Sequence, residues 1–593
     1  MENRVTIGGS TLAQKQRLEL TWIGKDEQPK LEPRILLEDP ELSYHAKERV
    51  TENDIFDNRL IFGDNLLALK ALEQEFAGRI KCIFIDPPYN TGNAFEHYDD
   101  GLEHSIWLNM MFARLKILHK LLREDGFIFV QIDNNEQAYL KVIMDEIFGR
   151  NNFLNMIAYE RSGSAGIGQG ATFLLNNTEY ILVYAKDKKQ IEKIEAKSYK
   201  HLDKEIMKRY NKILIDQGSK ELIKEFNSKS NGQPVKIYRH RNYKIETISL
   251  ANFNNRKDEI EKLYFKYFDS IFRTTNPQAE NSFQNELISY MDKDCLYSVE
   301  YIPSRGKEKG ILTNKYYLNK EIFAWLKDSA EIKDNQVVKT NKMGDFWRNE
   351  DIPKANLANE GGVNFKRGKK PEALIKTILD MVTEEGDWVL DSFAGSGTTG
   401  AVAHKMRRRW IMIELGEHCH THIITRMKKV IDGTDQGGIS KAVNWQGGGG
   451  FRYYKLAPSL LKKDKFGNWI INPEYNAEML AEAMCKHEGF TYNPDPEVFW
   501  KQGQSTENDF IYTTTQLVTQ QMVEGIVEQM KENETLLICC KAYNVNVEDF
   551  PKVTIKKIPQ AILNKCEFGR DDYSLKINEL PMKEREPEQL ELF

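Results

Sequence analysis

The chain has 593 residues, of which 40% are hydrophobic and 29% charged, with 83 Lys and Arg against 88 Asp and Glu. At one domain per ~100–200 residues, this length predicts three to five folding units, which excludes a single small binding module. No stretch approaches the ~18–20 apolar residues of a membrane span, and residues 1–40 lack the apolar centre of a secretory signal. We therefore expect a soluble protein of the cytoplasm that binds no membrane.

The pattern of the chain changes near residue 58. Residues 1–57 carry prolines and no sustained periodicity, which indicates an extended arm. Between residues 58 and 187, short apolar runs alternate with helical patterns: 60–62, 65–76, 82–85, 105–122, 127–132, 136–148 and 180–184. Strands that alternate with helices predict an α/β fold with a doubly wound, mostly parallel sheet.

Residues 188–340 interrupt this regularity and are basic. They contain 30 Lys and Arg against 22 Asp and Glu, so the rest of the chain carries a net charge of −13. Basic and aromatic residues interleave within 236–244, where Arg239, Arg241 and Lys244 lie, and this composition suits phosphate neutralisation combined with base contacts. We predict an inserted domain that recognises a DNA target; a solvated, lysine-rich surface is the alternative.

The α/β pattern returns in residues 341–457. A helix that opens at Pro371, a strand at 388–390, a glycine turn, a helix through Met406 and a strand at 410–413 predict the second part of the same sheet. Residues 458–593 follow as a C-terminal domain of unknown role, without a motif that we can interpret.

The seven cysteines are odd in number and scattered, without the spacing of a disulfide framework or a zinc site. They predict reduced thiols. Histidines cluster at 418–422, but ligands adjacent in one short run rarely converge on a single ion, so we expect no metal.

A glycine turn at 391–400, with the sequence DSFAGSGTTG, lies between a predicted strand and a predicted helix. Glycines in such a turn let the backbone approach a ligand closely, and Glu414, at the end of the next strand, is placed to accept hydrogen bonds from ribose hydroxyls. A nucleoside cofactor is expected. Gly395, Gly397 and Gly400 also satisfy the GxGxxG pattern, so this motif alone is compatible with NAD, FAD and S-adenosylmethionine.

The second motif, Asp86-Pro87-Pro88-Tyr89, directly follows the predicted strand at 82–85. It places a carboxylate, a proline-fixed carbonyl and an aromatic ring at the carboxyl end of a parallel strand, where open α/β sheets bind ligands. An exocyclic amine requires this set, because the two acceptors favour its pyramidal, nucleophilic form while the ring stacks on a flipped base.

The two motifs and their order resemble the amino-methylating DNA methyltransferases of the permuted, or β, class, and most closely the modification subunit of type III restriction-modification systems. In that arrangement the motif at 86–89 precedes the basic insert and the loop at 391–400 follows it. The segments 20–25, 63–69, 90–92 and 449–454 are also similar to this group. The resemblance covers residues 20–185 and 340–456.

The resemblance implies a catalytic pocket formed by Asp86, Pro87, Pro88 and Tyr89. Asp rather than Ser in the first position implies adenine N6 rather than cytosine N4 as the target. The cofactor is implied to be S-adenosylmethionine, with Glu414 at its ribose and Asp64 at its adenine. The remaining implied cofactor residues are Asp391, Phe393, Ala394, Gly395, Gly397, Thr398 and, within the stretch 364–371, Lys370. One departure is Gly101, where relatives tend to have an aromatic residue.

The expected reaction is an in-line displacement in which adenine N6 attacks the methyl carbon of a sulfonium, without a metal. An NAD-dependent oxidoreductase would leave the motif at 86–89 and the basic insert unexplained. A methyltransferase acting on cytosine N4, RNA or a protein amide would keep both motifs, and a non-catalytic DNA-recognition subunit is a further alternative.

The resemblance also implies partners. These are double-stranded DNA, a second copy of the chain in a homodimer, and an ATP-dependent restriction subunit with helicase and endonuclease activity. The chain has no Walker A pattern, which fits an ATPase supplied by a partner. A stand-alone adenine methyltransferase, or one in another association, is the alternative.

Overall fold

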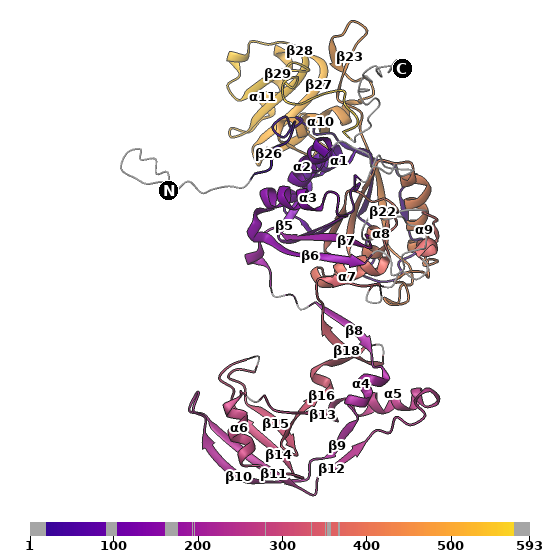
Figure 1. Cartoon of the computed structure of the whole chain (residues 1–593). Coiled ribbons are helices and arrows are strands. Elements are labelled where there is room, and N and C mark those ends of the chain that lie inside the picture. The colour runs from indigo at the N-terminus through magenta and orange to yellow at the C-terminus, as the bar shows by residue number, and fades with distance from the viewer. Residues whose placement is uncertain are drawn as a thin grey trace, which may run out of the picture. The chain divides into compact units, whose positions relative to one another are not determined.

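The computed structural model describes residues 19–90, 104–160 and 176–573, apart from residues 193, 195, 279, 307, 334, 350, 351, 353–356, 366 and 367. The chain divides into two compact units: residues 195–344 form one, and the segments on either side of them form the other. Figure 1 shows the elements of both. No helix among the described residues has the length and apolarity to cross a membrane.

The first unit is built on an eleven-stranded sheet in the order β1-β22-β3-β21-β20-β4-β5-β7-β6-β19, with β2 paired to β22. The strands are β1 (Leu36–Glu38), β2 (Tyr44–His45), β3 (Asn58–Phe62), β4 (Ile80–Ile85), β5 (Leu122–Ile132), β6 (Phe153–Glu160), β7 (Thr178–Ala185), β19 (Phe346–Trp347), β20 (Trp388–Asp391), β21 (Arg409–Glu414) and β22 (Gly450–Leu456). All neighbours from β22 to β5 pair in parallel, whereas β7 runs antiparallel to both β5 and β6. The predicted doubly wound, mostly parallel fold is therefore confirmed.

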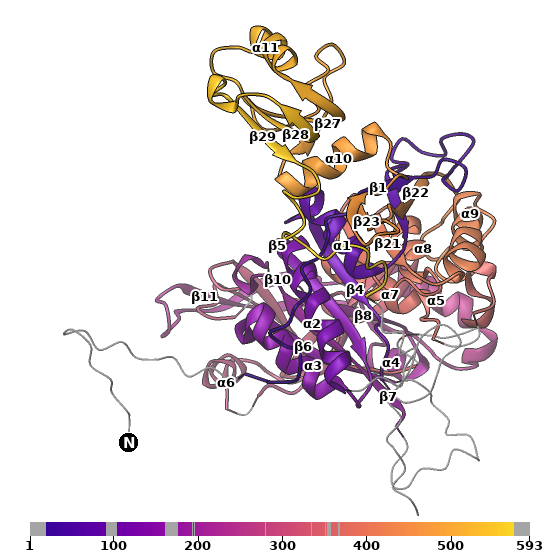
Figure 2. The same ribbon diagram turned by 90° about the horizontal axis from the view of Figure 1, so that it is seen from above.

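Helices connect these strands. α1 (Asn65–Phe76) and α2 (His104–Leu121) pack on each other and link β3 to β4 and β4 to β5, while α3 (Gln137–Met144) follows β5. α7 (Glu372–Val382), α8 (Thr398–Lys405) and α9 (Thr425–Ile431) form a second group, in which α8 contacts both neighbours. Figure 2 shows the two groups from above.

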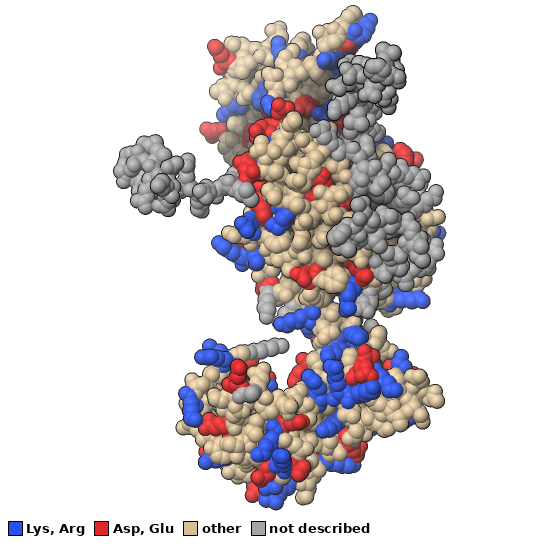
Figure 3. Space-filling model, viewed as in Figure 1, with Lys and Arg blue, Asp and Glu red and all other residues tan. Residues whose placement is uncertain are grey.

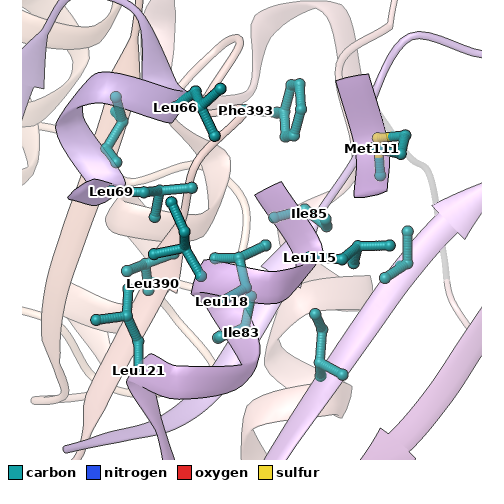
Figure 4. Close-up of a cluster of buried hydrophobic side chains, with 14 of the residues drawn as sticks. Leu66, Leu69, Ile83, Ile85, Met111, Leu115, Leu118, Leu121, Leu390 and Phe393 are labelled. Atoms are coloured by element: carbon teal, nitrogen blue, oxygen red, sulfur yellow. The ribbon is translucent and has the colours of Figure 1, made fainter. Parts of the chain in front are cut away.

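The main core lies between α1, α2 and the central strands. Leu66, Leu69, Leu115 and Leu118 from the helices share one buried cluster with Ile83 on β4, and Figure 4 shows Leu118 beside Ile83 and Leu115 beside Ile85. Each of these side chains is at most 2% exposed. Spacings of three and four residues on a helix place apolar side chains on one face, which explains why these segments pack against the sheet.

The structure corrects several expected boundaries. The strand expected at 127–132 begins at Leu122, and the helix expected at 136–148 ends at Met144 and continues as a π-helical turn. Pro371 is the N-cap of α7 rather than its first helical residue. Strand β6 was not predicted, although Met156–Tyr159 form a short apolar run within it.

The second unit contains an eight-stranded sheet in the order β10-β11-β14-β15-β16-β13-β9-β12, and a three-stranded sheet, β17-β18-β8. These strands are β8 (Lys197–His201), β9 (Lys212–Asp216), β10 (Ser219–Asn227), β11 (Pro234–Arg241), β12 (Lys244–Thr247), β13 (Ile271–Thr275), β14 (Leu296–Tyr301), β15 (Thr313–Leu318), β16 (Glu321–Trp325), β17 (Ala330–Lys333) and β18 (Gln336–Lys342). Its helices are α4 (Lys204–Arg209), α5 (Lys257–Lys266) and α6 (Ser282–Ser289). The strand pairs in both sheets are antiparallel.

The C-terminal part of the first unit has a sheet of its own, β25-β26-β27-β28-β29. Its elements are β23 (Leu461–Lys463), β24 (Trp469–Ile471), α10 (Ala477–Glu488), β25 (Thr491–Tyr492), β26 (Gly503–Thr506), β27 (Asp509–Thr519), α11 (Gln520–Gln529), β28 (Thr535–Asn544) and β29 (Val553–Lys557). All seven cysteines of the chain lie among the described residues, and all are free thiols.

A buried ion network joins α7, α8 and α9. Lys405 Nζ lies 2.8 Å from Glu372 Oε2 and 2.7 Å from Asp435 Oδ2, and Arg426 Nη2 lies 2.7 Å from Glu372 Oε1. Arg426 Nη1 also donates to the carbonyl of Ser396, at 3.1 Å, and to Thr398 Oγ1, at 2.8 Å. The network therefore fixes the glycine turn relative to the start of α7.

We expect Lys405→Met to lower the free energy of unfolding by about 3–5 kcal/mol, because it leaves two buried carboxylates without their ammonium partner. Lys376→Met on α7 is the control, since it removes an i,i+4 pair with the half-exposed Asp380 and should cost less than about 0.5 kcal/mol. Urea denaturation followed by circular dichroism measures both. Equal losses for the two variants would contradict this assignment.

Candidate active site

Two loops lie at the carboxyl ends of adjacent strands. β4 ends at Ile85, directly before Asp86, and β20 ends at Asp391, where the glycine turn begins. The two strands pair in parallel, with Val389 opposite Cys82. The pairing thus brings together two motifs that are about 300 residues apart in the chain.

Asp86 and Tyr89 form a half-buried polar cluster with Lys370 and Glu179. The Tyr89 hydroxyl donates to Asp86 Oδ1 at 2.7 Å and lies 3.1 Å from Glu179 Oε2. Lys370 Nζ lies 3.0 Å from Asp86 Oδ2, donates to the Tyr89 hydroxyl at 2.8 Å and lies 3.4 Å from Glu179 Oε2. Two carboxylates, one ammonium and one phenol therefore share one site.

The charges of this cluster depend on one another. Burial raises the pKa of Asp86 and outweighs the opposing effect of the Lys370 ammonium. Burial would lower the pKa of Lys370, but Asp86 and Glu179 together hold it above its usual value. Burial and the two carboxylates raise the pKa of Tyr89 well above its usual value. Lys370 is therefore a permanent cation, and Asp86 is the group whose charge its neighbours control.

The two prolines hold backbone carbonyls in this turn. The carbonyl of Pro88 accepts a hydrogen bond from the indole Nε1 of the buried Trp107, at 2.7 Å. Asn90 closes the turn with φ of 59°, and its side chain donates to Glu136 Oε1 at 2.7 Å. Since the Pro88 carbonyl is bound by Trp107, Pro87 is the candidate source of the second acceptor for an amine.

The glycine turn is shaped by the two carboxylates that flank it. Asp391 accepts from the backbone N–H of Phe393 at 3.0 Å and from Thr399 Oγ1 at 2.6 Å. Glu414 Oε2 accepts from the N–H of Gly395 at 2.8 Å. Gly397 has φ of 73°, which favours glycine, and an added Cβ would lie 3.1 Å from Ile423. Phe393, Ala394 and Thr398 are all buried beside these groups.

The two carboxylates have opposite pKa shifts. Burial raises the pKa of Asp391 to about 7, although Thr399 and the N–H of Phe393 oppose the increase. Burial would also raise the pKa of Glu414, but His418, at 3.1 Å, and the N–H groups of Gly416 and Gly395 lower it below its usual value. Asp391 is thus close to half-protonated at neutral pH, while Glu414 is ionised.

Asp64 lies at the start of α1 and serves as its N-cap. Oδ1 accepts from the N–H groups of Leu66 and Leu67 at 2.9 and 3.1 Å. Oδ2 accepts from the N–H of Tyr573 at 3.0 Å and lies 3.5 Å from Arg114. The contact of Asp64 with an adenine stays a prediction. Both oxygens of this carboxylate already accept hydrogen bonds from the protein.

The sequence prediction omitted Glu179. This residue is 5% exposed on β7, and its Oε2 also accepts from Gln131 Nε2 at 2.5 Å. The sequence marks Glu179 only as an acidic residue at the beginning of an otherwise apolar strand, just outside the predicted range 180–184. Lys370 was predicted to contact the cofactor; its ammonium contacts Asp86, and its carbonyl accepts from Thr398 Oγ1 at 3.2 Å.

The predicted DNA-binding residues lie on β11 (Arg239, Arg241) and on the edge strand β12 (Lys244) of the larger sheet of the second unit, and each has an acidic neighbour. Arg241 Nε donates to Glu221 at 2.8 Å, Lys244 Nζ lies 2.7 Å from Glu246, and Arg239 Nη1 lies 3.8 Å from Asp292. Figure 3 shows basic and acidic side chains interspersed on this unit.

The smaller sheet of the second unit brings lysines together. Lys342 lies directly opposite Lys197, and Lys339 directly opposite Lys200. Tyr199, between the two lysines of β8, is 46% exposed. Like charges directly opposite one another destabilise a sheet. Lys197 and Lys200 already pair with Glu331 and Asp203, so Lys339 and Lys342 are the lysines that suit an anionic partner.

Gly101 lies outside the described residues. Among the described residues, no group of three or more His, Cys, Asp or Glu is arranged to hold a metal ion. His420 Nε2 lies 2.8 Å from the Tyr453 hydroxyl, so it points to a structural partner.

A family model described as DNA methylase (N6_N4_Mtase) matches residues 80–425. The chain is 43% identical over 418 residues to a Haemophilus influenzae protein named "Probable type III restriction-modification enzyme HindVI Mod subunit", a match covering 68% of this chain and 54% of that protein. It is 25% identical to the type III restriction-modification enzyme EcoP15I Mod subunit of Escherichia coli, covering 80% of this chain and 78% of that protein. The chain spans about half the length of the first of these relatives.

The solved structures that are similar to the chain include an M1.HpyAVI–SAM complex. The two are 12% identical with a TM-score of 0.27, and the match covers 62% of this chain and 98% of that one.

Proposed function

Because the chain belongs to the DNA methylase family, we propose that it methylates N6 of a flipped adenine in double-stranded DNA, with S-adenosylmethionine as the methyl donor. We propose further that it is the modification and specificity subunit of a type III restriction-modification system, acts as a homodimer, and assembles with an ATP-dependent restriction subunit. The likeness to the two Mod subunits supports this role.

One observation carries the proposal: the Asp86-Pro87-Pro88-Tyr89 motif and the glycine turn lie at the carboxyl ends of two adjacent parallel strands. The carboxyl ends of the strands are where open α/β sheets bind ligands. The turn would hold a nucleoside cofactor next to a pocket whose acceptors suit an exocyclic amine.

The residues around the turn fit the cofactor. Glu414 is an ionised acceptor suited to ribose hydroxyls, and Asp391 is a carboxylate suited to a cationic group. The turn itself consists of residues that include Phe393, Ala394, Gly395, Gly397 and Thr398. A side chain added at Gly397 would meet Ile423. When bound, the cofactor supplies a methyl group on a positively charged sulfonium.

The pocket residues then act on the base. Asp86 and the Pro87 carbonyl accept the two hydrogens of the amine, which directs its lone pair out of the ring plane. Tyr89 stacks on the base and holds it out of the duplex. Because positive charge develops on the amine nitrogen, a carboxylate acceptor stabilises the transition state more than the ground state.

We expect Asp86→Ala and Tyr89→Ala each to reduce methyl transfer by about 100- to 1000-fold, because each removes a group that touches the reacting base. Unmethylated duplex DNA is incubated with the protein and isotopically labelled S-adenosylmethionine, and the nucleosides are analysed by mass spectrometry. Cofactor affinity should stay within a few-fold of that of the wild type, and Asp125→Ala, which removes ion pairs outside this site, is the control.

The nucleoside formed by the wild type decides the reaction. Labelled N6-methyladenine supports the proposal. Labelled N4-methylcytosine would overturn the assignment of the target base, and a cofactor-bound protein that labels no DNA would overturn the proposed substrate.

The raised pKa of Asp391 predicts that cofactor binding depends on pH. With its pKa raised to about 7, the carboxyl is largely protonated at pH 6 and ionised at pH 8. If a cationic ligand lowers this pKa by about one unit, its affinity should increase about fivefold between pH 6 and pH 8. Calorimetric titration of S-adenosylmethionine measures the increase, and Asp391→Asn should abolish it. A persisting increase in the variant would contradict the role of Asp391.

The second unit is the proposed source of sequence recognition, through Arg239, Arg241 and Lys244 or through the lysines of β8 and β18. Each lost phosphate contact should reduce the slope of log affinity against log salt by about 0.9. We expect Lys339→Ala/Lys342→Ala to reduce the slope by about two. Arg239→Ala/Arg241→Ala should have a smaller effect, because acidic neighbours already neutralise these side chains. Fluorescence anisotropy from 50 to 300 mM salt measures the slopes, and unchanged slopes in both variants would refute the assignment.

A further inference from the structure

Both oxygens of Asp86 have partners from the protein itself. Oδ1 accepts from the Tyr89 hydroxyl at 2.7 Å, and Oδ2 lies 3.0 Å from Lys370 Nζ. A target amine must donate to this same carboxylate if the proposed function is correct. In the described arrangement an ammonium therefore occupies a position in which the amine would bind.

Lys370 Nζ is chemically similar to the target amine that would replace it on Asp86. It is a nitrogen donor on Oδ2 of Asp86, it contacts Tyr89, and it carries the positive charge that an amine nitrogen acquires during methyl transfer. The backbone of Lys370 is held elsewhere, because its carbonyl accepts from Thr398 Oγ1 at the glycine turn. Only the side chain must move for the position on Asp86 to become vacant.

Glu179 provides an alternative partner for the ammonium. Its Oε2 lies 3.4 Å from Lys370 Nζ, and its side chain is only 7% exposed. Gln131 Nε2 holds this same oxygen at 2.5 Å. Moving a buried ammonium away from a carboxylate is costly unless another carboxylate receives it, so the second acid allows an exchange that a single acid would prevent.

We propose that Lys370 is a positioning residue that occupies the place of the target amine on Asp86 until a base enters, and that Glu179 receives its ammonium at that moment. This inference rests on the proposed function, because it requires an exocyclic amine as the incoming group. The lysine keeps its proton and exchanges one carboxylate partner for another. Its positive charge also favours the ionised form of Asp86 while no base is bound.

The exchange predicts distinct effects for two substitutions. With Glu179→Gln, the ammonium has no second anion and stays on Asp86, so the KM for DNA should rise about tenfold or more while cofactor affinity is unchanged. With Lys370→Met, the groups that remain around Asp86 are Glu179, Asp391 and Tyr89, none of which is cationic. The pKa of Asp86 should then rise, and the acid limb of the kcat/KM profile for DNA should move to higher pH by about one unit or more.

Lys369→Met is the matched control. Lys369 is also buried, and its ammonium donates to the backbone carbonyls of Glu360 and Val363. Its removal tests the loss of a buried lysine next to Lys370, while the Tyr89 and Lys370 contacts of Asp86 are kept. We expect no shift of the acid limb in this variant, even if its stability falls.

A double-mutant cycle gives the decisive result. In the Lys370→Met background, Glu179→Gln should no longer change the KM for DNA, because the ammonium that Glu179 receives is absent. A tenfold rise that persists in this background would overturn the proposal, as would an acid limb that stays in place in Lys370→Met. If the wild type labels no DNA, the proposed function itself fails; if it methylates adenine but the cycle shows no coupling, only the role of Lys370 fails.

Discussion

The parallel pairing of β4 with β20 is the constraint on which the site depends. Val389 lies opposite Cys82 and Leu390 opposite Ile83, so the two strands end side by side although about 300 residues separate them in the chain. One strand delivers Asp86 and the other the glycine turn. The apolar helices α1 and α2 support the first strand, and the buried network around Glu372 fixes the turn relative to α7. An insertion of any fold can therefore separate the two motifs in sequence without separating them in space.

Buried charge then determines how the site behaves. Two acidic side chains and the Lys370 ammonium meet around Tyr89, in an arrangement that would be costly if any one partner were missing. Lys370 connects this cluster to the glycine turn, since its side chain contacts Asp86 and its carbonyl accepts from Thr398. One residue thus couples the groups that we propose to act on the base with those that we propose to hold the cofactor.

Features that depend on residues close together in the chain could be predicted from the sequence. The motif at 86–89 and the turn at 391–400 are contiguous and follow apolar runs, so both the sheet and its two functional loops could be inferred. Glu179 could not be, because its proximity to Asp86 arises from the antiparallel insertion of β7 beside β5, which no local pattern reveals. Similarly, the contact of Asp64 with Tyr573 could not be predicted, because it joins residues that are 509 positions apart in the chain. In the basic insert, composition indicated charge but not the acidic neighbours of Arg241 and Lys244.

The central claim is that Asp86 receives an adenine amine in place of the Lys370 ammonium. A crystal structure of the protein with duplex DNA and a non-reactive cofactor analogue tests this most directly. The account predicts a flipped adenine stacked on Tyr89, with its N6 donating to Asp86 and the carbonyl of Pro87, and the Lys370 ammonium bound to Glu179. A flipped base in the pocket with Lys370 still on Asp86, or a target nitrogen that does not contact Asp86, would contradict it.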